Sequence, residues 1–283
     1  MAKTIAVINH KGGVGKSTTS VGIATVLAGA HEKKVLLMDL DPQANSTLML
    51  IGEARYKELN DQGQTLYKLI YNGMDGFTRQ AIPAFIERRV GNIRDVTSLD
   101  LLPSSMDLIQ LQDKIIYAAK RAISPVDPTR ILFDAMGGID KIYDYIIIDC
   151  PPSLGVVTLN GLRICDGIII PTIPDIVSTY GIPQIISHVN KFAESINRYI
   201  PCFGIIATKV RSNCKLHENT INMLKKGTDA PLFKAMIFES ARIGEAAEYH
   251  ECNTLRQKWG YAGQYDQFNS LAVELMWRVN KQS

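Results

Sequence analysis

The chain has 283 residues, of which 46% are hydrophobic and 21% are charged, a balance typical of a soluble globular protein with a sizeable core. Its five cysteines include no C-x-x-C pair, which argues against a structural zinc site and against a disulfide framework. The formal net charge of +3 does not by itself indicate nucleic-acid binding, and no apolar run is long enough to span a membrane. With no signal peptide evident, we expect a cytoplasmic protein without a membrane partner.

The first predicted strand, residues 3–9, leads directly into a glycine-rich loop, residues 10–17. The loop ends in Gly-Lys-Ser, which matches a Walker A phosphate-binding motif, although His10 occupies the place of its usual first glycine. Backbone N–H groups of such a loop converge on a phosphate at the positive end of the following helix. We therefore expect Lys16 to bind the outer phosphates of a nucleoside triphosphate and the Ser17 hydroxyl to be a Mg²⁺ ligand.

Strand and helix patterns alternate along the whole chain, as in an α/β protein. Continuous apolar runs predict strands that are buried on both faces, near residues 3–9, 34–40, 99–102, 144–149, 167–171, 203–208 and 234–238. Helices are predicted near residues 17–30, 104–121, 129–141, 153–165, 176–198, 214–226, 240–250 and 264–280. The fold class that follows is a mostly parallel, twisted sheet with helices on both faces, built as a single domain over residues 1–283.

The stretch between the second and third predicted strands, residues 48–97, is less regular. It contains five glycines and helical pieces only around residues 65–70. We interpret it as an elaborated crossover insertion in the domain. A scaffold excursion and a partner-binding or dimer surface are both compatible with this composition.

Two predicted strands end in aspartates, at the sheet edge that faces the ligand in open α/β folds. Asp149 follows the apolar run 145–148 and is the expected Walker B carboxylate that holds the Mg²⁺ shell. The alternative is a buried acid that caps the turn at residues 151–152. Asp39 and Asp41 follow the second strand. Asp39 is a candidate for the Mg²⁺ shell or, alternatively, a partner for the phosphate-loop backbone.

These motifs resemble those of the ParA/MinD/Soj family of P-loop ATPases, whose deviant Walker A motif carries a second lysine. The matching stretches are Lys11 to Thr18, Asp39 to Thr47, Leu99 to Ser105 and Tyr143 to Ser153. The Asp-Pro-Gln-x-Asn and Asp-Cys-Pro-Pro-Ser forms are similar to the ParA/Soj partition branch. The resemblance implies ATP and Mg²⁺ as cofactors, and hydrolysis of ATP to ADP and phosphate that is slow without a partner.

The resemblance also implies roles for single residues. Lys11 would reach across a homodimer interface to the partner's nucleotide, whereas on its own it reads as a solvated loop lysine. Asp41 would orient the attacking water, so that the catalytic residues would be Lys11, Lys16 and Asp41. The expected nucleotide-binding residues are Lys11, Gly12, Gly13, Val14, Gly15, Lys16, Ser17, Thr18 and, for the adenine, Thr208 and Lys209; the expected metal ligands are Ser17, Asp149 and Asp39.

Partition ATPases of this type bind DNA non-specifically when they dimerise on ATP, and a small ParB-like DNA-binding adaptor resets them by stimulating hydrolysis. The resemblance thus implies partition of a plasmid, chromosome or integrative element, with the protein on the nucleoid in its ATP state. Non-specific binding requires basic side chains that face phosphates. Candidates are Lys209, Arg211, Lys215 and Arg242, each of which is alternatively an ordinary solvated charge. Glu239 replaces a basic residue of the family, and a glutamate there would weaken DNA binding.

Other readings use the same nucleotide site. A MinD-like membrane- or cell-pole-positioning ATPase would carry a basic amphipathic C-terminal helix. Here Leu271, Leu275 and Val279 share a helical stripe and only Arg278 and Lys281 are basic, so we expect this helix to pack on the domain. A nucleotide-gated scaffold is a second alternative. An iron–sulfur reductase of nitrogenase type is disfavoured, because the cysteines show no evident cluster-ligand pattern.

Overall fold

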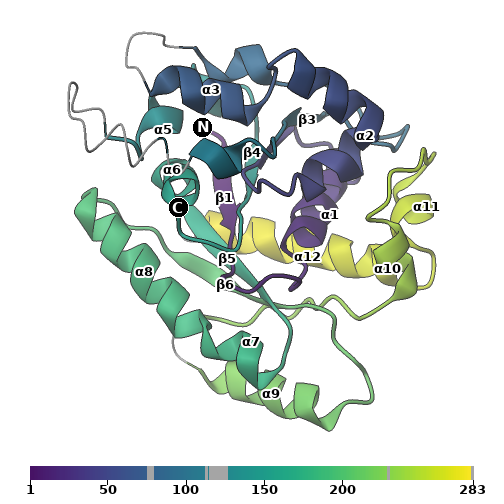
Figure 1. The fold of residues 1–283 in the computed structure, drawn as a ribbon. Helices are drawn as coiled ribbons and strands as arrows, with labels where there is room; N and C mark the ends of the chain where they lie inside the picture. The colour runs from purple at the N-terminus through teal and green to yellow at the C-terminus, as the bar shows by residue number, and fades with distance from the viewer. Residues whose placement is uncertain (75–79, 112–113, 115–126, 228–229, 282–283) are drawn as a thin grey trace.

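The computed structural model describes residues 1–74, 80–111, 114, 127–227 and 230–281. At its centre lies a six-stranded sheet in the order β3-β2-β4-β1-β5-β6, in which every pairing is parallel (Figure 1). The strands are β1 (Lys3–Val7), β2 (Val35–Asp39), β3 (Leu99–Leu102), β4 (Tyr145–Asp149), β5 (Gly167–Thr172) and β6 (Cys202–Ala207). This arrangement confirms the predicted fold class, and the first six predicted strands are all present.

Helices cover both faces of the sheet, and this explains why its strands are apolar at consecutive positions. Ile5 and Val7 of β1 belong to one buried cluster, while Ala6 and Ile8 belong to another on the opposite face. The first cluster includes residues of α1 (Lys16–Gly29), α11 (Leu255–Trp259) and α12 (Gln264–Lys281). The second includes residues of α3 (Leu66–Gly73), α5 (Ile131–Asp134), α6 (Val156–Ile164) and α8 (Ile182–Ser195).

The C-terminal helix α12 packs directly on α1, the helix that follows the phosphate loop. A Cβ atom on Gly22 of α1 would lie 2.3 Å from the ring of Phe268, so the close approach of the two helices requires glycine there. Trp259 of α11 is fully buried beside them and donates from its Nε1 to Thr25 Oγ1 at 3.0 Å. The apolar stripe of α12 is buried, as predicted, and comprises Leu271, Leu275 and Val279.

The prediction of a seventh strand at residues 234–238 is wrong. This segment lies beside β6 but makes only isolated bridges, Ile205 to Leu232 and Val210 to Phe238. The backbone N–H groups of Lys234 and Ala235 donate instead to the carboxylate of Glu274 on α12, at 3.0 and 2.9 Å. A side chain therefore satisfies donors that a strand would use in a ladder.

Several predicted helices are shorter or broken, and two helices, α11 and the one that begins at Asn45, were missed. The crossover 48–97 contains most of α2 (Asn45–Asp61), which kinks at Gly52, together with α3 and a 3₁₀ turn (Ile82–Phe85). Of the predicted helix 104–121, residues 108–111 are helical, and 112–113 and 115–121 lie outside the described residues. The predicted helix 129–141 is replaced by α5 and a 3₁₀ turn (Ile139–Lys141), and the predicted helix 176–198 is divided into α7 (Ile176–Tyr180) and α8. The predicted helix 240–250 is shortened to α10 (Ala241–Glu245). The helix α9 (Lys215–Lys226) lies where it was predicted.

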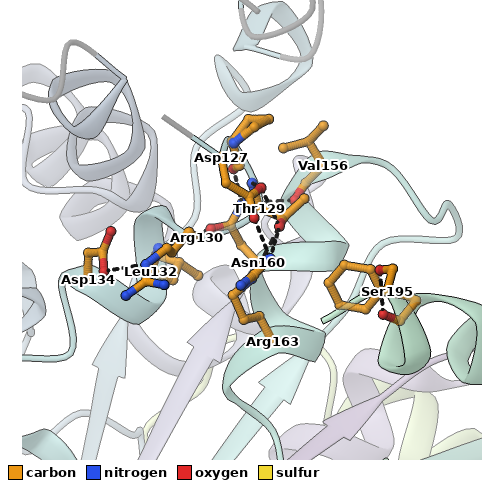
Figure 2. Close-up of polar contacts among 11 residues, drawn as sticks. Asp127, Thr129, Arg130, Leu132, Asp134, Val156, Asn160, Arg163 and Ser195 are labelled. Atoms are coloured by element: carbon orange, nitrogen blue, oxygen red, sulfur yellow. Dashed lines mark hydrogen bonds and ion pairs between the residues drawn. The ribbon is translucent and has the colours of Figure 1, made fainter. Parts of the chain in front are cut away.

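A buried polar network fixes α6, the helix that follows β4, to the segment before α5 (Figure 2). Asn160 of α6 is fully buried; its Oδ1 accepts from the N–H of Leu132 at 3.0 Å, and its Nδ2 donates to the Pro128 carbonyl at 2.8 Å. Arg163, one turn later, donates to Thr129 Oγ1 at 2.8 Å and pairs with Asp127. These contacts join α6, which follows β4, to the segment that leads into β4, and they thereby help to fix the position of Asp149 at the end of that strand.

Candidate functional site: the phosphate loop and its carboxylates

The phosphate loop joins β1 to α1 at the carboxyl edge of the sheet. Gly13 and Gly15 have φ angles of 73° and 83°, a conformation that L side chains rarely adopt, and α1 begins directly after Gly15. Asn9 fixes the loop entrance, because its Oδ1 accepts from the N–H of Lys11 at 2.9 Å while its Nδ2 donates to the carbonyl of Pro171 at 2.8 Å. The loop is thus preformed by its own backbone and by β5.

Lys16 is the buried cation of the loop. Its side chain lies at the start of α1 with the residue only 6% exposed, and its Nζ donates to the carbonyl of Lys11 at 3.1 Å. Burial lowers the pKa of the Lys16 ammonium, while the charges of Asp149 and Asp41 act in the opposite direction. A cation held in a partly dehydrated loop of N–H groups favours an anion such as a phosphate.

Lys11 points away from the loop, toward the start of α7. Its Nζ donates to Ser178 Oγ at 2.8 Å and lies 3.7 Å from Asp175 Oδ1. Asp175 caps α7 at the same time, because its Oδ1 accepts from the N–H of Ser178 at 2.6 Å and its Oδ2 accepts from the Ser178 hydroxyl at 2.8 Å. Apolar side chains beside this contact are exposed on α7, namely Ile176, Val177 and Tyr180. In this chain Lys11 is therefore bound to a charged helix cap on a surface rich in exposed apolar groups.

Asp149, at the end of β4, accepts hydrogen bonds from three serine hydroxyls. Ser20 donates to its Oδ1 at 3.1 Å, Ser46 donates to its Oδ2 at 2.6 Å, and Ser17 also bonds to this carboxyl group. The carboxyl group is completely buried, and burial raises its pKa while Ser46 and Ser17 oppose the rise. The carboxylate and the Ser17 hydroxyl meet beside Lys16, as a Mg²⁺ site between protein and phosphate requires, since Mg²⁺ takes one or two protein oxygens and keeps waters and phosphate oxygens for the rest.

Asp39, at the end of β2, is fully buried and ties that strand to α2. Its Oδ2 accepts from the N–H and the hydroxyl of Thr47 at 2.8 and 2.7 Å, and its Oδ1 accepts from the N–H of Asp41 at 3.1 Å. Burial, and then the nearby Asp149, raise the pKa of Asp39 well above its ordinary value. Both oxygens of Asp39 therefore already have protein donors.

Asp41 lies in the turn between β2 and α2. Its Oδ1 accepts from the N–H of Gln43 at 3.0 Å, and its backbone carbonyl accepts from the Ser104 hydroxyl at 2.6 Å. The residue is 5% exposed, and its Oδ2 accepts none of the hydrogen bonds found within the described residues. One carboxylate oxygen is thus fixed by the turn, and the other is available to a small donor.

A separate pocket of about 280 Å³ lies beside the loop, between the start of α1 and the segment after β6. Thr208 lines it and donates from Oγ1 to the carbonyl of Val14 at 2.8 Å, which ties the end of β6 to the phosphate loop. Lys209 follows with a φ angle of 49°, and Phe238 and Glu239 form the opposite wall. The structure therefore brings the loop, Thr208 and Lys209 together around one pocket, and binding of the base there stays a prediction.

Of the four candidate DNA-binding residues, Lys209 borders this pocket, Arg211, Lys215 and Arg242 do not line it, and two of the four are paired internally. Arg211 Nε is 2.5 Å from Glu239 Oε2, and Arg242 Nη1 is 3.1 Å from Glu245 Oε2. Lys209 and Lys215 are exposed, and neither forms an ion pair within the part of the chain that the structure describes. Glu239 thus neutralises one candidate directly, in addition to its own charge.

Sequence reasoning missed the hydroxyl groups that hold the two buried carboxylates. Ser20 lies one helical turn after Lys16 in α1, and Ser46 and Thr47 lie in the first turn of α2. Serine and threonine at such positions are common, so no signal in the sequence singled out these three. Among the described residues, no three His, Cys, Asp or Glu side chains form a metal-binding group.

Comparisons with known proteins agree with this geometry. Residues 2–202 match the family model described as an AAA domain. The chain is 30% identical over 249 residues to the sporulation initiation inhibitor protein Soj of Bacillus subtilis (strain 168), which covers 88% of this chain and 89% of that protein. It is 29% identical over 251 residues to the chromosome-partitioning ATPase Soj of Treponema pallidum (strain Nichols), with 88% of each chain covered.

The fold also matches solved structures. The cobyrinic acid a,c-diamide synthase of Mycobacterium smegmatis, solved with bound ADP and magnesium, superposes with a TM-score of 0.76 and 22% identity, over 100% of this chain and 97% of the other. At this identity the likeness concerns the fold alone. A shared fold does not decide the chemistry, so the function has to be argued from the site residues.

Proposed function

The chain belongs to the AAA domain family and is a ParA/Soj-type P-loop ATPase, and from this premise we propose that it is a DNA-partition ATPase that uses ATP and Mg²⁺ as a dimerisation switch. The observation that carries the proposal is the position of Lys11, which the phosphate loop directs outward to the cap of α7. The proposal extends to slow hydrolysis, non-specific DNA binding, a hydrolysis-stimulating DNA-binding adaptor and a nucleoid location in the ATP state.

The residues of the loop divide the binding of the nucleotide among them. Backbone N–H groups of the loop and the Lys16 ammonium hold the phosphates, and the segment at Thr208 and Lys209 borders the base. Magnesium bound at Ser17 and Asp149 would neutralise charge on the outer phosphates. Asp39 supports this site from behind, because its oxygens hold Thr47 of α2 and the N–H of Asp41 in place.

Asp41 is the residue that we assign to the attacking water. The Gln43 N–H fixes Oδ1, so Oδ2 is left to accept a hydrogen bond from a water molecule and hold it for in-line attack. Phosphoryl transfer asks little covalent chemistry of a protein, so a positioned water and neutralised charge suffice.

Lys11 makes the site dependent on a second chain. Leaving Ser178 and Asp175, it would cross to the nucleotide of the partner, while the exposed apolar groups of α7 lie next to the point of departure. Light scattering with ATP tests this: the wild-type chain becomes a dimer, and Lys11→Ala stays monomeric although it still binds ATP. Lys57→Ala, an exposed lysine on α2, is the matched control and dimerises normally. An ATP-dependent dimer of Lys11→Ala would refute the cross-subunit role.

The output that we propose is non-specific DNA binding by Lys209, Arg211, Lys215 and Arg242. Support comes from Lys209, which borders the pocket beside Thr208, so that a change at the nucleotide can reach the segment after β6 through the Thr208 contact to the loop. The test is retention of plasmid-length DNA with ATP against ADP at rising salt, because phosphate contacts weaken steeply as salt increases. Equal retention with both nucleotides, or none at low salt, would exclude this output.

A further inference from the structure

A groove of about 920 Å³ opens between α12 and the segment that follows α9. Its floor includes Phe203 near the amino end of β6, and its walls include Pro231, Lys234 and Trp277. The phosphate loop lies at the carboxyl end of β6, where Thr208 contacts it, so the groove is at the other end of this strand from the loop. Nothing in the proposed partition cycle uses this groove.

The groove-facing side of α12 carries apolar side chains that the domain does not cover. Val273 and Trp277 are one helical turn apart and are 47% and 60% exposed, whereas Leu271 and Leu275 on the opposite side are fully buried. An exposed tryptophan beside a concave apolar wall is an unused anchor, since tryptophan is among the residues that contribute most to binding at interfaces.

The charges around this anchor are positive in sum. The carboxylate of Glu274 bonds Arg278 at 2.7 Å and the N–H groups of Lys234 and Ala235, so its charge is already matched within the chain. Lys234 and Lys281 then flank the groove, and neither pairs with a carboxylate of the described residues; the Lys281 Nζ lies 5.0 Å from the centre of the Trp277 ring. Two unpaired cations around an apolar anchor complement an acidic ligand.

The shape of the groove decides between modes of binding. Strand addition needs free backbone N–H groups on the edge segment, and Glu274 occupies those of Lys234 and Ala235. A bilayer surface is flat and would leave a groove of this volume unfilled, whereas a peptide can place a side chain in it. Side-chain insertion by a peptide is the mode that remains.

We propose that this groove docks an acidic segment of a partner protein, which inserts an apolar side chain beside Trp277 while its carboxylates meet Lys234 and Lys281. The proposal is independent of the nucleotide cycle and does not rest on it. It gives the chain a second attachment surface, on the side away from the phosphate loop.

The two tryptophans of the chain make a direct test possible, because Trp259 is fully buried and only Trp277 is open to a quencher. The probe is a synthetic twelve-residue peptide with a central Leu-Phe pair flanked by Asp and Glu, which has no tryptophan of its own. Acrylamide quenching of Trp277 should fall at least threefold when this peptide saturates the full-length chain. The same peptide with Lys in place of Asp and Glu, or with Ser in place of Leu-Phe, should leave the quenching unchanged.

Variants locate the binding. Reversing both charges, Lys234→Glu with Lys281→Glu, should weaken the acidic peptide roughly tenfold, as expected for two charge contacts, while Lys225→Glu with Lys226→Glu on exposed positions of α9 should not. Thermal unfolding of each variant shows that it is folded. No shielding of Trp277 by the acidic peptide at about 1 mM, equal shielding by the basic peptide, or shielding by phosphatidylglycerol vesicles alone would each overturn the proposal.

Discussion

Charged side chains are buried around the phosphate loop, at the carboxyl edge of the sheet, whereas they are largely solvated on the outer surface near the pocket at Thr208. Asp39, Asp149 and Lys16 are buried, and hydroxyl or backbone groups from other elements hold each of them. Arg211 and Arg242 are largely solvated and pair with nearby glutamates. Buried charges are costly to unpair, while exposed ion pairs contribute about 0–1 kcal/mol. The charges around the phosphate loop are therefore fixed by the fold, whereas single substitutions can change the charge of the outer surface at little cost in stability.

The largest effect that this comparison predicts is on Asp41. Asp41→Asn keeps the Oδ1 that accepts from Gln43, so the turn and ATP affinity should stay nearly unchanged. Turnover should fall on the order of 100-fold, because the amide is a poorer acceptor for the attacking water. Single-turnover hydrolysis and equilibrium ATP binding, measured on the same preparation, separate the two effects. Turnover close to wild type would remove Asp41 from the mechanism.

A substitution of Lys16 tests how the buried charges around the phosphate loop contribute to ATP binding. Lys16→Met keeps the apolar stem in its buried site and removes the cation, so affinity for ATP should fall about 100-fold through loss of charged hydrogen bonds to phosphate. Fluorescent ATP titration measures the change. Lys33→Met, on the loop before β2, serves as the control for loss of one lysine charge. Comparable affinity in Lys16→Met and the control would contradict a buried, built phosphate site.

The buried carboxyl pair predicts a pH dependence of stability. The pKa of Asp39 is raised in the folded state, so the native chain binds a proton that the unfolded chain releases. The free energy of unfolding should therefore fall as pH rises from the unfolded value, about 4, toward the raised one. Urea unfolding of the nucleotide-free protein at two pH values should show the decline, and Asp39→Asn should make it smaller. An unchanged slope in Asp39→Asn would mean that other groups cause the decline.

The smallest predicted effect is on the outer surface. Glu239→Gln removes the carboxylate that pairs with Arg211 and should raise affinity for DNA in the ATP state roughly threefold, with a steeper salt dependence. Glu194→Gln on α8 makes the same change of net charge elsewhere and should have little effect. Filter retention at several salt concentrations compares them. Equal gains in both variants would assign the effect to net charge instead of the released arginine.

The sequence predicted the sheet well because its six strands are continuous apolar runs that are buried on both faces. It failed at residues 234–238, where the alternation of Phe233, Ala235 and Ile237 is strand-like but Glu274, distant in the sequence, takes the backbone donors. The helix α2 was missed because Gly52 interrupts its pattern; there the backbone has a φ angle of 71° and the helix kinks. The single-domain organisation over residues 1–283 stays a prediction.

For the site, the glycine and lysine spacing was sufficient to place the loop, and the apolar run before Asp149 was sufficient to place that carboxylate. The hydroxyl groups of Ser20, Ser46 and Thr47 could not be chosen from the sequence, because their partners come from other strands. Nor does any local pattern give the contact of Lys11 with Asp175, which joins two loops that are adjacent only in the folded sheet. The roles assigned to these residues stay proposals.

Asp175 makes two bonds to Ser178 in addition to its contact with Lys11. When the lysine departs, no helix start unravels and no buried anion is stranded, since the side chain of Asp175 is 26% accessible to water. The contact of Lys11 with Asp175 and Ser178 is therefore easily broken. In the proposed dimer switch, assembly need not wait for a slow opening step at this contact, and its rate would then be set by how often nucleotide-loaded chains meet.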